Sequence, residues 1–242
     1  MRLRIDLELQ KQVQKMRVDW NERARQNAWH YVATGREDWT AEEFFESGEE
    51  TVRGFVLNDM QNICQGRDPK HMRVLEVGCG AGRVTRALAK VFGEVWAVDI
   101  SPEMVRLARH ALAGFGNVRA LVNSGSDLQV VRRPWWERFR SLEFDFAFST
   151  IVFQHIPSRQ VIENYIFEVA RLLRPGGLFK FQVQGAPGVS SSPGDTWIGV
   201  TFSEEEMRDI AERAGFEMRY AHGSGTQDFW LWFFRTQRPP LQ

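Results

Sequence analysis

A strand, a glycine loop and a helix in succession are the feature that most constrains how this chain folds. The segment RVLEVGCGAGRVTRALA at 73–89 opens with an apolar run, carries Gly78, Gly80 and Gly82 at alternate positions, and closes with helical spacing. Glycine allows a sharp backbone turn and a close approach to a ligand, because no side chain stands in the way. The segment therefore predicts a βα unit with a ligand-binding loop at the carboxyl end of its strand.

The same alternation of apolar runs and amphipathic stretches continues after this segment, which is typical of βα units around a mostly parallel sheet. The last two runs are separated only by HGSGTQD at 222–228, which is too short for a crossover helix and predicts an antiparallel hairpin. We predict an α/β fold with a seven-stranded, mostly parallel, doubly wound sheet and an antiparallel last strand. The expected strands lie near 72–77, 94–99, 117–122, 144–149, 177–184, 216–221 and 229–236, and the expected helices near 82–92, 102–113, 130–140, 158–172 and 203–213.

Residues 1–70 differ from the rest, since they are polar and helical in pattern with interleaved aromatic side chains. Thr40 and Glu43 form a capping-box pattern before apolar positions that predict one long helix through Met60. The first ten residues fit a strand by alternation and a helix by wider apolar spacing, and we favour the helix. We predict two domains, an N-terminal helical lid at 1–70 and a core at 71–242.

Composition narrows the possible partners. The 242-residue chain has 31 Lys plus Arg and 31 Asp plus Glu, so it lacks the net positive charge that nucleic-acid binding usually needs. No apolar run is long enough to span a membrane and no secretory signal is present, so we expect a cytoplasmic protein without a membrane partner. The two cysteines, Cys64 and Cys79, form no CxxC pair, and no histidine-rich cluster accompanies them. Neither a disulfide framework nor a metal site is therefore predicted.

The glycine loop also distinguishes two classes of ligand. A dinucleotide-binding GxGxxG pattern needs glycine where Arg83 stands, whereas this chain has GxGxG preceded by the acid Glu76. EVGCGAG at 76–82 and AVDIS at 97–101 resemble the first motif and the second-strand acid of class I S-adenosylmethionine-dependent methyltransferases, and the resemblance covers about 72–236. It implies the fold of that family and S-adenosylmethionine as the cofactor.

The resemblance also implies which residues hold the cofactor. In that family the acid that closes the second strand binds both ribose hydroxyls, which is the role of Asp99 here; a helix cap is the alternative. NSGSDL at 123–128 is similar to the segment whose acid contacts the adenine amino group, here Asp127, although Asp in such a stretch is also a common turn former. Cys79 is interpreted as a small buried residue rather than a nucleophile. The expected cofactor-binding residues are Glu76, Gly78, Cys79, Gly80, Gly82, Asp99, Ile100, Met104, Ser126, Asp127, Leu128, Ser149, Thr150 and Gln154.

Methyl transfer from a sulfonium needs few catalytic groups, because the methyl carbon is already activated. His155 follows the fourth strand, and histidine titrates near neutrality, so His155 is the candidate general base; a pocket-wall or helix-capping histidine is the alternative. Gln154 is a candidate hydrogen-bond partner of the acceptor or the cofactor. The fourth strand ends in Ser149 and Thr150 rather than in an Asn/Asp-Pro-Pro-aromatic pattern, which argues against methylation of amide or base nitrogens.

The acceptor is expected to be a small molecule methylated on oxygen, nitrogen or sulfur, and the chain to act as a monomer or homodimer. Aromatic residues of the lid and of the loop after the fifth strand are candidate substrate contacts, with docking of helices on the core as the alternative. An RNA or protein methyltransferase and a binding protein without catalysis also stay open. The expected substrate-contacting residues are Trp20, Trp29, Tyr31, Trp39, His155 and Trp197.

Overall fold

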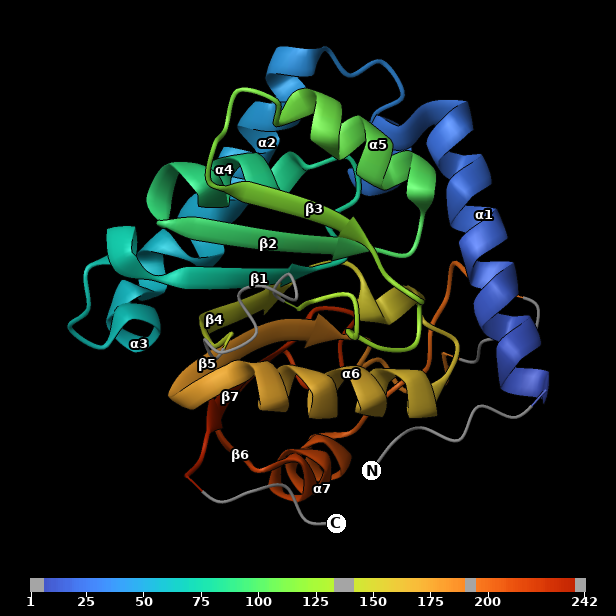
Figure 1. Ribbon diagram of the computed structural model, residues 1–242. Coiled ribbons are helices and arrows are strands. Elements are labelled where there is room, and N and C mark those ends of the chain that lie inside the picture. The colour runs from blue at the N-terminus through green and yellow to red at the C-terminus, as the bar shows by residue number, and fades with distance from the viewer. Residues whose placement is uncertain (1–6, 133–141, 190–194, 238–242) are drawn as a thin grey trace. The chain divides into compact units, whose positions relative to one another are not determined.

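The computed structural model describes residues 7–132, 142–189 and 195–237. Its strands are β1 (Arg73–Val77), β2 (Glu94–Asp99), β3 (Val118–Val122), β4 (Phe144–Ser149), β5 (Leu173–Val183), β6 (Phe216–His222) and β7 (Phe229–Arg235). They form a seven-stranded sheet of order β3-β2-β1-β4-β5-β7-β6, with helices beside it (Figure 1). The predicted fold class is confirmed.

The chain divides into two compact units. Residues 17–123 carry β1, β2 and β3 and are called the glycine-loop unit. Residues 1–16 together with 124–242 carry β4 to β7 and are called the His155 unit. The two predicted domains, with their boundary at residue 70, stay a prediction.

The glycine-loop unit has three parallel strands with helices that begin where the sequence predicts. β1 pairs with β2 and β2 with β3, so their carboxyl ends lie at one edge. α4 (Arg83–Val91) packs against β2, and α5 (Pro102–Ala111) packs against β2 and β3. α5 begins at Pro102 because the hydroxyl of Ser101 accepts a hydrogen bond from the amide of Met104 at 3.1 Å.

The N-terminal residues are helical, as predicted. The capping box of Thr40 and Glu43 is present, and the first helix is described from Leu7 onward. Residues 1–6 of the chain lie outside the described part. The elements are α1 (Leu7–Val32), α2 (Ala41–Phe55), α3 (Met60–Cys64) and the short 3-10 turns η1 (Leu57–Asp59) and η2 (Pro69–His71).

The single long helix predicted through Met60 is wrong, since α2 ends at Phe55 and η1 separates it from α3. The carboxylate of Asp59 accepts a hydrogen bond from the side-chain amide of Asn62 at 2.7 Å. Asn58 and Asp59 have low helix propensity, which disfavours a helix that continues through them. The chain turns again at Gln65, which has a left-handed φ of 51°.

The His155 unit combines a parallel strand pair with an antiparallel hairpin. β4 and β5 are parallel, whereas β7 runs antiparallel to both β5 and β6, which confirms the predicted hairpin. α6 (Arg159–Leu172) packs against β5, α7 (Glu204–Ala214) packs against β6, and the two helices contact each other (Figure 1). Ser203 and Glu206 form a capping box at the start of α7.

β5 begins at Leu173, four residues earlier than expected, and its pairing with β4 is irregular: Leu173 lies beside Phe144, and Leu178 beside Phe146. The four residues 174–177 face one residue of β4, so β5 carries three extra residues here, and Pro175, Gly176 and Gly177 lie inside the strand. The helix predicted near 130–140 falls largely on 133–141, outside the described residues.

No helix in the described ranges is long and apolar enough to cross a membrane. Over the same residues, no group of three or more His, Cys, Asp and Glu side chains is arranged to hold a metal ion.

Candidate functional site

The glycine loop follows β1 and has the backbone that only glycine adopts readily. Gly78, Gly80 and Gly82 have φ angles of 81°, 51° and 89°. The amides of Gly78 and Cys79 donate to the carbonyl of Val98 in β2 at 2.8 and 3.0 Å, which fixes the turn. A Cβ atom on Gly80 would lie 2.7 Å from a methyl group of Val32, so the end of α1 lies directly on this loop.

Asp99 ends β2 and connects the glycine loop to α5. One carboxylate oxygen accepts from the amide of Gly80 at 2.9 Å and the other from the amide of Ser101 at 2.8 Å. Burial raises the pKa of Asp99, and the backbone amides act in the opposite direction. Ser101, not Asp99, caps the helix, so the helix-cap interpretation of Asp99 does not hold. A carboxylate has about four lone-pair sites, so each oxygen retains capacity for a further hydrogen bond.

Glu76 is the second buried acid of this unit. Its carboxylate accepts a hydrogen bond from the hydroxyl of Thr85 at 2.6 Å. Burial raises the pKa of Glu76 to about 7, with the hydroxyl of Thr85 and the charge of Arg83 opposing this shift. Burial likewise raises the pKa of the Cys79 thiol, which fits its interpretation as a small buried residue rather than a nucleophile.

Helix α1 contributes a polar contact that the sequence did not reveal. The side-chain oxygen of Asn21 accepts from the hydroxyl of Ser101 at 3.1 Å and from the amide of Glu103 at 2.9 Å. The guanidinium of Arg17 donates to the carbonyl of Asn123 at 2.9 Å. α1 is thereby held at the start of α5 and the end of β3, although no motif around Asn21 distinguishes it from other polar helix residues.

The aromatic residues of 1–70 that are predicted to contact the substrate lie within the glycine-loop unit. Trp29 stacks on the buried ring of Phe44 with centroids 5.3 Å apart, and Trp39 meets the same ring edge-on at 6.3 Å. Trp20 packs against the same cluster, which includes Met104, whereas the hydroxyl of Tyr31 donates to Gln26 on the surface. These contacts fit the helix-docking alternative, and substrate contact by these residues stays a prediction.

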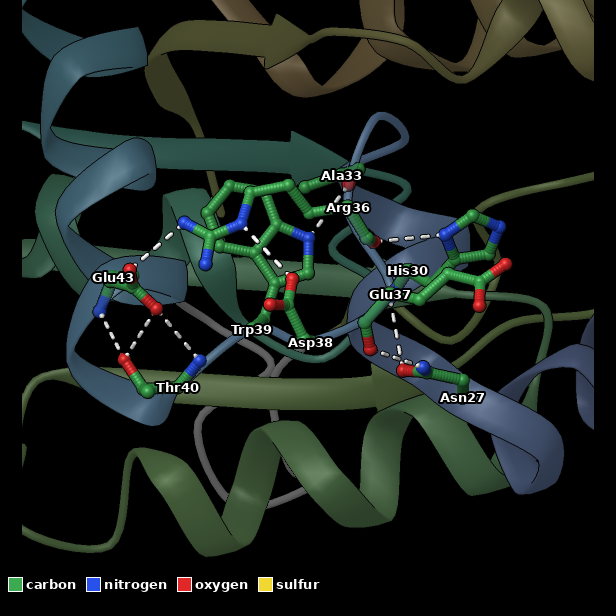
Figure 2. Close-up of polar contacts among 9 residues, drawn as sticks. All are labelled: Asn27, His30, Ala33, Arg36, Glu37, Asp38, Trp39, Thr40 and Glu43. Atoms are coloured by element: carbon green, nitrogen blue, oxygen red, sulfur yellow. Dashed lines mark hydrogen bonds and ion pairs between the residues drawn. The ribbon is translucent and has the colours of Figure 1, made fainter.

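The connection between α1 and α2 is folded back on itself by polar contacts (Figure 2). Asn27 interrupts the helical backbone of α1, accepts from the amide of His30 at 3.2 Å and donates to the carbonyl of Glu37 at 3.0 Å. Arg36 donates to Glu43 at 2.9 Å, across the capping box of α2. The loop that carries Trp39 is therefore held from both of its flanking helices.

In the His155 unit, the predicted adenine-binding segment forms a tight turn. The hydroxyl of Ser124 accepts from the amides of Ser126 and Asp127, and Asp127 accepts from the amide of Gln129 at 3.0 Å. Asn164 of α6 donates to the carbonyl of Ser126 at 2.6 Å. Asp127 thus acts as a turn former, and its cofactor contact stays a prediction.

His155 lies in η4 (Phe153–His155), just after β4, and both of its ring nitrogens have partners. Nδ1 bonds the carbonyl of Trp197, and Nε2 lies 3.3 Å from the side-chain nitrogen of Gln154. The ring also faces that of Trp197, with centroids 4.9 Å apart. The structure thus brings together three of the predicted residues, namely Gln154, His155 and Trp197. It adds Gln182, which donates to Gln154 at 2.9 Å and which sequence reasoning missed, although a glutamine in the buried run FKFQV is a visible signal.

The predicted residues therefore fall into two sets, one in each unit. Ser149 is buried at the end of β4, Leu128 and Ser126 are buried in the turn after β3, and Thr150 and Ile100 are partly exposed. The glycine-loop unit holds Glu76, Gly78, Cys79, Gly80, Gly82, Asp99, Ile100, Met104, Trp20, Trp29, Tyr31 and Trp39, and the His155 unit holds Ser126, Asp127, Leu128, Ser149, Thr150, Gln154, His155 and Trp197.

Comparison with known sequences assigns residues 74–177 to the family described as "Methyltransferase domain". A ubiquinone biosynthesis O-methyltransferase of Xanthomonas oryzae pv. oryzae (strain PXO99A) is 34% identical over 106 residues, which are 43% of this chain and 40% of that protein. Its counterpart in Xanthomonas campestris pv. campestris (strain B100) is 36% identical over 106 residues, again 43% and 40%. The chain thus spans 40% of the length of these relatives.

Solved structures extend the likeness to nearly the whole fold. The complex of DhpI with SAH matches with a TM-score of 0.62 and 19% identity, over 93% of this chain and 98% of that one. Magnesium protoporphyrin IX methyltransferase of Synechocystis PCC 6803 with bound SAM matches with a TM-score of 0.63 and 18% identity, over 93% and 97%. At these identities the likeness is one of fold.

Proposed function

We propose that this chain, which belongs to the class I S-adenosylmethionine-dependent methyltransferases, transfers a methyl group from S-adenosylmethionine to an oxygen, nitrogen or sulfur atom of a small molecule. The observation that carries the proposal is Asp99, a buried carboxylate at the carboxyl end of β2 that is tied to the glycine loop by the amide of Gly80. Two adjacent hydroxyls, such as those of a ribose, suit an acceptor of this kind.

The residues of the glycine-loop unit fit the cofactor. The two oxygens of Asp99 accept hydrogen bonds from the amides of Gly80 and Ser101, and the carboxylate has lone-pair capacity beyond these two bonds for ribose hydroxyls. The glycine backbone after β1 permits close approach of a ligand. Ser126, Asp127 and Leu128 are proposed for the adenine end of the cofactor, as the family resemblance implies, and Ser149, Thr150 and Gln154 for its methionine end.

His155 is proposed as the general base. When bound, S-adenosylmethionine supplies an activated methyl carbon: its bond to sulfur breaks as a lone pair of the acceptor atom bonds the carbon, and an O–H or N–H acceptor must lose its proton. His155 takes that proton at Nε2 once the acceptor has replaced the 3.3 Å contact with the side-chain nitrogen of Gln154. The bond from Nδ1 to the carbonyl of Trp197 keeps the ring oriented. An acceptor that is already a thiolate needs no such base.

The two Xanthomonas relatives are O-methyltransferases, so oxygen acceptors are the first to test. The matched region covers 106 residues and does not define the acceptor, for which Trp20, Trp29, Tyr31, Trp39 and Trp197 remain proposed contacts. Transfer of isotope-labelled methyl from S-adenosylmethionine to metabolite, tRNA and protein extracts distinguishes a small-molecule enzyme from an RNA or protein methyltransferase. Calorimetric binding of S-adenosylhomocysteine without any transfer would instead indicate a binding protein.

Residues 1–70 are proposed to act as a lid that orders when the site is filled. The anchors of α1 at Asn21 and Arg17 are the contacts that would respond to such ordering. Hydrogen exchange of residues 15–45 with and without S-adenosylhomocysteine tests this. Equal protection in both states would contradict a lid. The monomeric or homodimeric state and the cytoplasmic location stay predictions.

A further inference from the structure

The side-chain amide of Gln182, on β5, has only one orientation that satisfies its neighbours. Its oxygen accepts from the backbone amide of Ile151 at 3.2 Å, and a backbone N–H can only donate. Its nitrogen donates to the carboxylate of Asp228 at 2.7 Å and approaches the carbonyl of Gln227 at 3.3 Å, and both of these groups only accept. Gln182 is 2% exposed, so water cannot compensate for a reversed amide.

This orientation is transmitted to Gln154. The nitrogen of Gln182 also donates to the side-chain oxygen of Gln154 at 2.9 Å, so the nitrogen of Gln154 faces the other way. That nitrogen lies 3.3 Å from Nε2 of His155. Since an amide NH₂ group only donates, Nε2 is required to be an unprotonated acceptor.

The opposite side of the ring gives the same answer independently. Nδ1 of His155 bonds the carbonyl of Trp197, which has no hydrogen to donate, so Nδ1 is required to carry the proton. The two constraints come from different elements, β5 and the segment that carries Trp197. They agree on one form of the ring, neutral and protonated at Nδ1.

We infer that Gln182, acting through Gln154, is a positioning residue that holds His155 as its neutral Nδ1–H tautomer with Nε2 as the proton acceptor. The inference deepens, and rests on, the proposed role of His155 as the base. If Nε2 is protonated, its N–H faces the NH₂ group of Gln154, so two donors meet unless the side-chain amide of Gln154 flips. The amide of Gln154 can flip only if the amide of Gln182 flips too, and a flipped Gln182 loses its hydrogen bonds with Ile151 and Asp228. The charged groups in these contacts are Asp228 beside Gln182 and Asp195, which accepts from the amide of Trp197 at 2.7 Å.

The test is nitrogen-15 NMR of the five histidine rings in the full-length protein without cofactor or acceptor, with His155→Gln used to assign the signal of His155. The expected result at pH 7 is a neutral His155 with protonated Nδ1 and unprotonated Nε2. A neutral ring protonated at Nε2, or a doubly protonated ring, would by itself overturn the inference.

Gln154→Glu sharpens the test because it replaces the donor that faces Nε2 by an acceptor while still accepting from Gln182. His155 is expected to become doubly protonated at pH 7 in this variant. Gln184→Glu is the matched control: it adds the same charge two residues along from Gln182, and the side-chain oxygen of Gln184 already accepts from the amide of Ala186 at 3.0 Å. The control is expected to leave the tautomer unchanged. An equal response in both variants would contradict transmission through Gln154.

The outcome is separable from the proposed function. The NMR measurement involves no methyl transfer, so the predicted tautomer together with inactivity in every acceptor screen would reject the function alone. In an active enzyme, Gln154→Glu is expected to shift the acidic limb of the kcat/KM profile to higher pH, since the base then retains its proton longer. A lower rate with an unshifted profile would indicate a merely structural role.

Discussion

The carboxylate of Asp99 accepts a hydrogen bond from the backbone amide of Gly80 at 2.9 Å, so the acid that ends β2 holds the loop that follows β1. This contact joins the two motifs that are most distinctive in the sequence. It places a buried negative charge beside a backbone that carries no side chain, which is the basis of the first prediction.

Asp99→Ala is expected to weaken binding of S-adenosylhomocysteine by roughly 10- to 150-fold, because a charge-assisted acceptor contributes about 1.5–3 kcal/mol. Asp99→Asn retains one acceptor oxygen and should lose less. Titration calorimetry measures both dissociation constants, and thermal unfolding verifies that the variants are folded. A folded Asp99→Ala variant with wild-type affinity would exclude the proposed ribose contact.

Glu76 predicts a stability difference that depends on pH. Its pKa is about 7 in the folded protein and near the ordinary 4.5 in the unfolded chain, so the folded state retains a proton between these values. Its contribution to stability is present below pH 4.5 and is lost as pH rises through 7. Relative to Glu76→Gln, the wild-type free energy of unfolding should fall by roughly 3 kcal/mol across this window, measured by urea unfolding.

Glu94→Gln is the control for this experiment. Burial acts to raise the pKa of Glu94, but the hydrogen bonds from Trp96 and Arg73 outweigh burial and hold this pKa below its ordinary value. The contribution of Glu94 is therefore present at higher pH and lost as pH falls, which is the opposite sign. The same pH trend for both variants would show that the effect of Glu76 does not come from its own titration.

Replacing either of two glycines of α2 by alanine should change the stability of the protein in opposite directions. A Cβ atom on buried Gly48 would lie 2.1 Å from the carbonyl oxygen of Arg83, so Gly48→Ala is expected to destabilise the protein by about 1–3 kcal/mol. Gly54 is exposed in the same helix with no atom within 4 Å of such a Cβ, so Gly54→Ala is expected to stabilise it by about 0.5–1 kcal/mol. Chemical unfolding measures both, and equal effects would contradict the packing of α2 on α4.

Asn21→Ala is expected to weaken cofactor binding although Asn21 lies far from the sequence motifs. Its loss removes the acceptor for Ser101 and Glu103, and Ser101 is in turn a hydrogen-bond donor to Asp99. Asn27→Ala is the control, since the side chain of Asn27 bonds His30 and Glu37, away from Ser101 and Asp99 (Figure 2). Calorimetry is expected to show a several-fold loss of S-adenosylhomocysteine affinity for Asn21→Ala but not for Asn27→Ala. Equal losses of affinity in the two variants would show that the effect comes from the stability of α1.

The sequence by itself determined the sheet, the glycine loop and the acid at its neighbouring strand end. These features are local in the chain: strand alternation, glycine spacing and capping boxes each act within a few residues, so Asp99, Gly80 and the last hairpin were predictable. The family resemblance then supplied the cofactor.

Only the tertiary structure decided which distant side chains share a hydrogen bond. Asn21 meets Ser101 across 80 residues, and Gln182 meets Gln154 across 28, and no periodicity in one chain encodes such a pairing. The break at Phe55 was missed because the apolar pattern continues through it, although Asn58 and Asp59 have low helix propensity. Burial supplies the physical reason for the rest: it determines which amide can reverse, which acid retains its proton and which glycine has room for a methyl group.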